Sequence, residues 1–250
     1  MIDAAHAYAE LQARLAEVLA DLTDDGAAAP VPACPGWSVR DVVAHHCGLV
    51  VDIASGELAG FVDGVDLLEQ WRDPDVAHAR DALTARQVND RRGRSLSSLL
   101  GEWREAAERL LPMLRGERPL PDGVPAIFSG AVVNDVVVHE GDIRIALGLD
   151  PAPDGHAMSL ALAGYGFSLD RRLRALGLPP LVLGYDGKQR QLGGDAQPGA
   201  TLHASRFDLV RILASRRTPA EIVACDWTGD PEPYLSVLPE YGPVAASLGG

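Results

Sequence analysis

Apolar residues in the first half of the chain recur at alternating spacings of three and four. This is the spacing of an amphipathic helix with one buried face. The first stripe consists of Tyr8, Leu11, Leu15, Val18 and Leu22. The acidic, alanine-rich segment 24–32 ends it. A helix with one apolar stripe buries it most readily against other helices, so the spacing favours a helical bundle over a sheet.

Three further long helices are predicted in this half. The second begins after Pro35-Gly36-Trp37, with Ser38 as its N-cap and Asp41 three residues later in an aspartate version of the capping box. Its apolar face is Val42, Leu49 and Ile53. The third helix is predicted over residues 96–114 and the fourth over residues 132–147, whereas the segment 63–94 is too polar to assign. Four long helices joined in this way indicate a four-helix bundle.

The second half has a different texture. A helix is predicted over 158–176, a strand over 181–185 that turns at Asp186-Gly187, a second strand over 201–204 and a helix over 207–214. A proline pair at 151 and 153 precedes this region. We therefore predict an α+β chain, with a helix bundle over residues 1–150 and a smaller α/β domain over residues 151–250.

Composition excludes several classes of partner. The chain carries 22 Lys+Arg against 35 Asp+Glu, a formal net charge of −13, which would repel a nucleic-acid backbone. The longest uncharged run, from Gly155 to Leu169, has 15 residues, fewer than the roughly 18 of a membrane span. Residues 1–22 do not resemble a signal peptide, and three scattered cysteines favour a reducing compartment. We expect a cytoplasmic protein that binds neither nucleic acid nor membrane.

Polar side chains fall on the face of the fourth helix that should be apolar. Val132, Val136 and Ile143 define that face, and Asp135 and His139 lie on it one turn apart. A carboxylate and an imidazole at i and i+4 can reach one divalent cation, and burying either alone would be costly. A buried ion pair without metal is the simpler alternative.

The second helix offers a third ligand. His45 and His46 lie on either side of its apolar stripe, and geometry alone does not choose between them. One of them, together with Asp135 and His139, would give three ligands on facing helices and leave the remaining coordination positions open, as at a catalytic metal site. Cys34 is predicted to be a packing residue and Asp142 a surface or supporting residue.

Two segments resemble a known family. Residues 31–45, VPACPGWSVRDVVAH, are similar to the N-terminal signature of the mycothiol-dependent maleylpyruvate isomerase family, within the DinB-like metal-binding superfamily. Residues 135–148, DVVVHEGDIRIALG, resemble its second metal segment. The resemblance covers most of residues 5–150 and continues more weakly into 205–217.

The resemblance implies a ligand set and a cofactor. It selects His45, which lies four residues after Asp41, and adds Asp135 and His139 as ligands of a divalent metal, which we expect to be zinc. The characterised isomerase has glutamate where this chain has Asp135. Metal binding tolerates the shorter side chain, whereas the isomerase activity is the property that the change affects.

The implied chemistry uses a small thiol, mycothiol or a similar one. Its metal-bound thiolate would add to an electrophilic substrate, giving either cis–trans isomerisation or S-transfer. Arginines of the C-terminal domain, Arg206, Arg216 and Arg217, would bind a substrate carboxylate. The alternative function is a non-enzymatic metal-binding or regulatory protein built on the same bundle.

Overall fold

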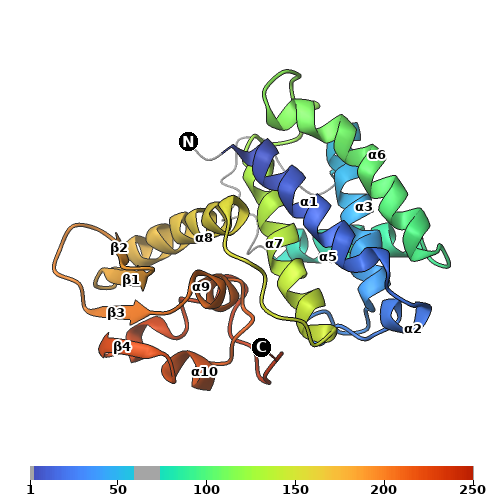
Figure 1. Ribbon diagram of the computed structural model, residues 1–250. Coiled ribbons are helices and arrows are strands. Elements are labelled where there is room, and N and C mark those ends of the chain that lie inside the picture. Colours follow the sequence, from blue (N-terminus) through green and yellow to red (C-terminus); the bar gives the residue numbers. More distant parts are fainter. Residues whose placement is uncertain (1–2, 59–73, 250) are drawn as a thin grey trace. The chain divides into compact units, whose positions relative to one another are not determined.

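The computed structural model describes residues 3–58 and 74–249, and the chain divides into two compact units, Met1–Asp150 and Pro151–Gly250 (Figure 1). The first unit is helical. Its elements are α1 (Ala4–Ala20), α2 (Asp24–Ala27), α3 (Val39–Ser55), α5 (Pro74–Asn89), α6 (Leu96–Leu114) and α7 (Phe128–Ala146).

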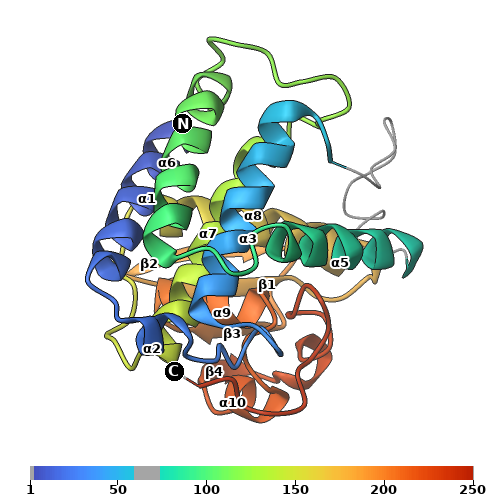
Figure 2. The ribbon, with the colours of Figure 1, turned by 90° about the vertical axis from the view of Figure 1, so that its right-hand side faces the viewer.

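The helices α1, α3, α6 and α7 of the first unit pack in a closed ring. α1 contacts α6 and α7, and α3 contacts the same two helices from the other side (Figures 1 and 2). α5 packs against α3 and runs across it in Figure 2. The predicted four-helix bundle is therefore confirmed, with α5 added to it from the segment that the sequence pattern left unassigned.

The apolar stripes form the core of this bundle. Tyr8, Leu11 and Leu15 of α1 are fully buried, but the stripe continues through Leu19, and Val18 and Leu22 are only half-buried. α1 ends at Ala20, so a stripe that extends to residue 22 was wrong. The segment expected only to interrupt the helix contains the short helix α2, whose N-cap Thr23 accepts from the backbone N–H of Gly26.

α3 begins as the sequence predicts. Ser38 accepts from the backbone N–H of Asp41, and the Asp41 carboxylate accepts from the backbone N–H of Ser38, so the capping box is confirmed. The helix is buried on most of its circumference because α5, α6 and α7 all pack against it. Leu49, predicted for the buried face, is instead half-buried.

The second unit contains a small mixed sheet. The unit starts with α8 (His156–Ala175), and its strands are β1 (Leu181–Tyr185), β2 (Lys188–Leu192), β3 (Ala200–His203) and β4 (Asp226–Gly229). The strand order is β2-β1-β3-β4, with β1 and β3 parallel and both outer pairs antiparallel. The helices α9 (Arg206–Leu213) and α10 (Pro219–Val223) complete it, so the predicted α+β class is confirmed.

The hairpin between β1 and β2 turns at Asp186-Gly187, as predicted. Both residues have positive φ, 49° and 69°, the backbone conformation that a two-residue hairpin turn of this kind requires. β4 was not predicted from the sequence pattern. In the described part of the chain, no helix is long and apolar enough to span a membrane.

Candidate metal centre

Donor atoms from α3 and α7 converge inside the bundle. The Asp135 carboxylate on α7 lies at the centre of the group, with its Oδ2 3.3 Å from His45 Nε2 and 3.3 Å from His46 Nδ1. Its Oδ1 lies 3.7 Å from Nε2 of His139, one turn further along α7. The structure therefore brings the three predicted ligands together and adds His46.

The three imidazole rings form a nearly equilateral triangle. The ring centroids of His45 and His46 are 5.6 Å apart, and each lies 5.5 Å from the ring of His139. The side chain of Asp135 keeps 28% of its surface exposed, whereas that of His46 is fully buried. Asp135 is therefore the most exposed member of the cluster, although its Oδ2 is buried.

A hydrogen-bonded chain fixes the orientation of His45. Gln87 of α5 places Oε1 2.7 Å from His45 Nδ1, and its Nε2 donates to Asp52 Oδ2 at 2.6 Å. Because the carboxylate only accepts, the amide must present its oxygen to His45, and His45 must carry its proton on Nδ1. Nε2 is then left with a lone pair that faces Asp135, as a metal ligand requires.

His139 is oriented in the same way by its own helix. Its Nδ1 lies 3.2 Å from Asp142 Oδ2, and the Asp142 side chain is fully buried. Donation from Nδ1 to this carboxylate leaves Nε2 facing Asp135, where a metal ion would take the place of the Nε2 proton. Asp142, left as a surface or supporting residue in the sequence interpretation, is a buried supporting residue in the structure.

Cys34 also lies at this site, in the loop before α3. Its Sγ is 3.6 Å from His139 Nδ1 and 4.0 Å from Asp142 Oδ2. The loop is closed by backbone hydrogen bonds between Val31 and Trp37 and between Cys34 and Trp37, and the Trp37 ring packs 5.5 Å from the ring of His45. The sequence interpretation treated Cys34 as a packing residue and gave no indication of this contact.

Burial and mutual charge shift the titration of the cluster. Burial lowers the pKa of His46 to about 4, and the Asp135 carboxylate offsets this only in part. Burial also opposes protonation of His139, but Asp135 and Asp142 outweigh it and raise its pKa to about 10. Despite burial, His45 and His139 hold the pKa of Asp135 well below its usual range.

The unsatisfied atoms of the cluster fit a divalent cation. Both ring nitrogens of His46 and the Oδ2 of Asp135 are buried and have no hydrogen-bond partner among the described residues. Such atoms are rare in proteins and call for a partner, and imidazole and carboxylate are the ligands of zinc and similar metals. Cys34, His139 and Asp142 form a second possible donor set, but its donors already contact one another.

The predicted arginines lie in the second unit and have partners there. Arg206 donates to Asp186 Oδ2 at 2.6 Å, and Arg217 donates to Asp208 Oδ1 at 3.0 Å. Arg216 donates to the carbonyl of Ala214. Their role toward a substrate stays a prediction.

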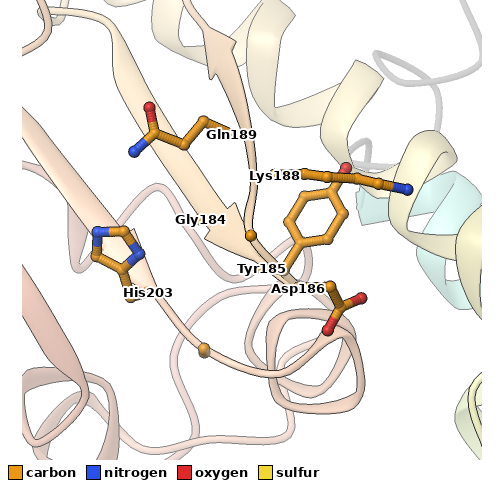
Figure 3. A pocket seen from close by; sticks show the side chains of 8 residues that line it. Gly184, Tyr185, Asp186, Lys188, Gln189 and His203 are labelled. Atoms are coloured by element: carbon orange, nitrogen blue, oxygen red, sulfur yellow. The ribbon is translucent and has the colours of Figure 1, made fainter.

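A shallow cavity of about 450 Å³ lies in the second unit at the β1–β2 turn (Figure 3). Its lining includes Tyr185, Lys188, Gln189 and His203, and the ring of His203 lies against Gly184, where a Cβ would clash with it. None of the three predicted arginines lines this cavity.

Comparisons with known proteins agree with this geometry. Residues 8–144 match the family model described as the mycothiol maleylpyruvate isomerase N-terminal domain. The chain belongs to this family. The matched span contains the whole donor cluster, including His45, Asp135 and His139, and its two helices carry the motifs on which the resemblance was based.

Two solved structures share the family fold. They are crystal structures of the mycothiol-dependent maleylpyruvate isomerase and of a histidine-to-alanine mutant, each at 15% identity with a TM-score of 0.52. Each match covers 86% of this chain and 88% of the other, so the DinB-like bundle followed by a small mixed domain is shared. No curated protein sequence matches the chain.

Proposed function

We propose that this protein is a metal-dependent enzyme of the maleylpyruvate isomerase type that uses mycothiol or a similar small thiol. The observation that carries the proposal is the convergence of His45, Asp135 and His139 on one buried point, with the carboxylate Oδ2 lacking a hydrogen-bond partner within the described residues. Family membership supplies the thiol, since the related crystal structures are of a mycothiol-dependent enzyme.

His45, Asp135 and His139 would hold a divalent metal, which would lower the pKa of a small thiol and so favour its nucleophilic thiolate form. The protein contributes orientation. Gln87 and Asp142 orient His45 and His139 so that their Nε2 atoms face Asp135, where an ion would be held. Asp135 has the most exposed side chain of the three, so a thiol would approach past it.

The reaction is either cis–trans isomerisation or transfer of the thiol to an electrophile. The arginines extend the proposal to the substrate, because a guanidinium binds a carboxylate through two parallel hydrogen bonds. Arg206 and Arg217 would have to exchange the carboxylates of Asp186 and Asp208 for that of the substrate.

Metal content and thiol dependence test the proposal together. Elemental analysis of untagged protein should give about one divalent ion per chain, lost in His45→Ala and His139→Ala, with both variants still helical. His78→Ala is the matched control, since His78 is exposed on α5. Turnover of maleylpyruvate or of an electrophile panel should require the thiol. A wild-type chain that binds no metal even after reconstitution would refute the proposal.

A second candidate, a non-enzymatic metal-binding protein, is favoured by one observation. His46 is a possible fourth donor, and four protein ligands are typical of closed structural zinc sites. It predicts a bound metal with no affinity for thiols.

A further inference from the structure

Among the residues of the donor cluster, His46 is the one that the family resemblance leaves without a role. Its side chain is fully buried between helices, although a neutral imidazole there needs at least one hydrogen-bond partner. Neither ring nitrogen has one among the residues that the structure describes. A fully buried imidazole in this state needs an explanation that packing alone does not give.

The ring is held in a defined orientation. The indole of Trp103 on α6 stacks on His46, with centroids 5.3 Å apart and planes at 19°. Trp103 is itself fixed, because its Nε1–H donates to the hydroxyl of Tyr8 on α1 at 2.7 Å. Two other helices therefore position a side chain that makes no hydrogen bond of its own within the described chain.

The orientation aims one nitrogen at the centre of the cluster. His46 Nδ1 lies 3.3 Å from Asp135 Oδ2, the same distance as His45 Nε2. One donor atom from each of His45, His46 and Asp135 lies within 4.8 Å of the other two, which is the spread expected of ligands around one ion. We infer that His46 is a metal ligand through Nδ1, so that this chain binds its metal with three imidazoles and one carboxylate.

This inference rests on the proposed metal site and makes it more specific. Three protein ligands leave an open position on a tetrahedral ion, whereas four ligands fill it. A thiol must then bind as a fifth ligand or displace one of the four. His46 would tighten metal binding and restrict the access of the thiol to the ion.

The experiment uses the full chain, stripped of metal and titrated with Co²⁺, whose visible absorption reports coordination number. Wild-type protein is compared with His46→Phe, which keeps an aromatic ring against Trp103 but has no donor, and with His46→Asn, which keeps a polar atom near the position of Nδ1. Leu110→Ala, which truncates a buried side chain of α6 two turns beyond Trp103, is the packing control. Metal affinity is measured by competition with a chelator.

We expect His46→Phe to bind one Co²⁺ more than about 100-fold more weakly, beyond the effect of losing a supporting residue. His46→Asn should fall between it and the wild type, and Leu110→Ala should keep the metal affinity of the wild type. Added thiol should give a stronger sulfur-to-cobalt charge-transfer band in His46→Phe at saturating metal, because a position has been opened.

Equal affinity and equal spectra in the wild type and His46→Phe would overturn the inference while leaving the proposed function in place. A wild-type chain that binds no cobalt would instead overturn the proposed function, and this inference with it. Circular dichroism of each variant shows whether the bundle is intact, and the His46→Asn result decides the matter if His46→Phe does not fold.

Discussion

Replacing Gln87 with leucine separates the role of the ligands from that of the residues that orient them. Gln87 is 2% exposed and hydrogen-bonds to the cluster through His45, whose Nδ1–H it accepts at 2.7 Å. Its other end donates to Asp52, which also receives Arg86 at 3.1 Å. Gln87→Leu has a similar volume but removes both hydrogen bonds at once.

The magnitudes follow from the groups left behind. His45 loses the acceptor of a buried N–H, and Asp52 loses one of two partners. At about 1–3 kcal/mol for each of these two groups, the metal-free bundle should lose about 2–6 kcal/mol of unfolding free energy. The tautomer of His45 is no longer fixed, and metal affinity should fall by about 10–100-fold, as for other residues that support a ligand.

Chelator competition and urea unfolding measure the two effects separately. Gln191→Leu is the control for the substitution, because Gln191 lies in the second unit and donates to the carbonyls of Gly194 and Ala196. The double variant Asp52→Asn/Gln87→Glu reverses the donor and acceptor between the two residues while keeping an acceptor for His45, and should recover most of the metal affinity. A folded Gln87→Leu protein with wild-type metal affinity would refute the reasoning.

Three further predictions test the packing and titration of buried groups. Gly48→Ala places a Cβ 2.5 Å from side-chain atoms of α5, so the helix must shift, and urea unfolding should show a loss of about 1–3 kcal/mol. Burial raises the pKa of Cys47 to about 12, so above about pH 9 the folded state keeps a proton that the unfolded state loses. The unfolding free energy should therefore fall above about pH 9, by up to about 1.4 kcal/mol per pH unit more than in Cys47→Ala. Arg172→Met leaves the buried carboxylate of Glu240 without its ion-pair partner and should lower the unfolding free energy in urea by about 3–5 kcal/mol. Loss of the exposed Arg174 should leave the stability unchanged.

The helical half of the fold could be predicted because its periodicity is strong. The third helix, residues 96–114, matches α6 at both ends, and α3 starts at the predicted capping box. Errors arose where periodicity alone could not determine which of two neighbouring apolar residues faces the core. Val18 and Leu19 are both apolar, and which of them faces the core depends on the neighbouring helices, which the sequence does not specify.

β4 of the second unit and helix α5 could not be predicted from periodicity either. β4 and α5 lack a periodic apolar stripe, so their local sequence carried little signal, and they form where neighbouring elements supply a surface to pack on. Gln87 lies on α5, so the hydrogen bonds that orient His45 could not be predicted from the spacing of residues in the sequence.

Asp135 and His139 could be predicted as ligands because they are polar residues on an apolar helix face, whereas His45 was selected over His46 by the family resemblance alone. Asp135 and His139 are one turn apart on one helix, so their proximity follows from helix geometry. His46 follows His45 directly, about 100° further around the helix, so the sequence offered the two as alternatives and did not indicate that both reach one carboxylate. It reaches the same carboxylate because Trp103 of another helix supports its ring, a tertiary contact that helical spacing does not encode.

His46 should therefore lower the stability of the metal-free bundle and raise the stability of the metal-bound bundle. Without metal, His46 is a buried polar group with no hydrogen bond among the described residues, and such a group costs about 1–3 kcal/mol. His46→Phe should thus raise the unfolding free energy of the metal-free protein. With metal bound, the wild type should gain more stability than the variant, because a ligand of the folded state stabilises in proportion to the logarithm of its affinity. Unfolding curves with and without Zn²⁺ test this reversal, and a variant that is less stable in both states would show that His46 acts as ordinary packing.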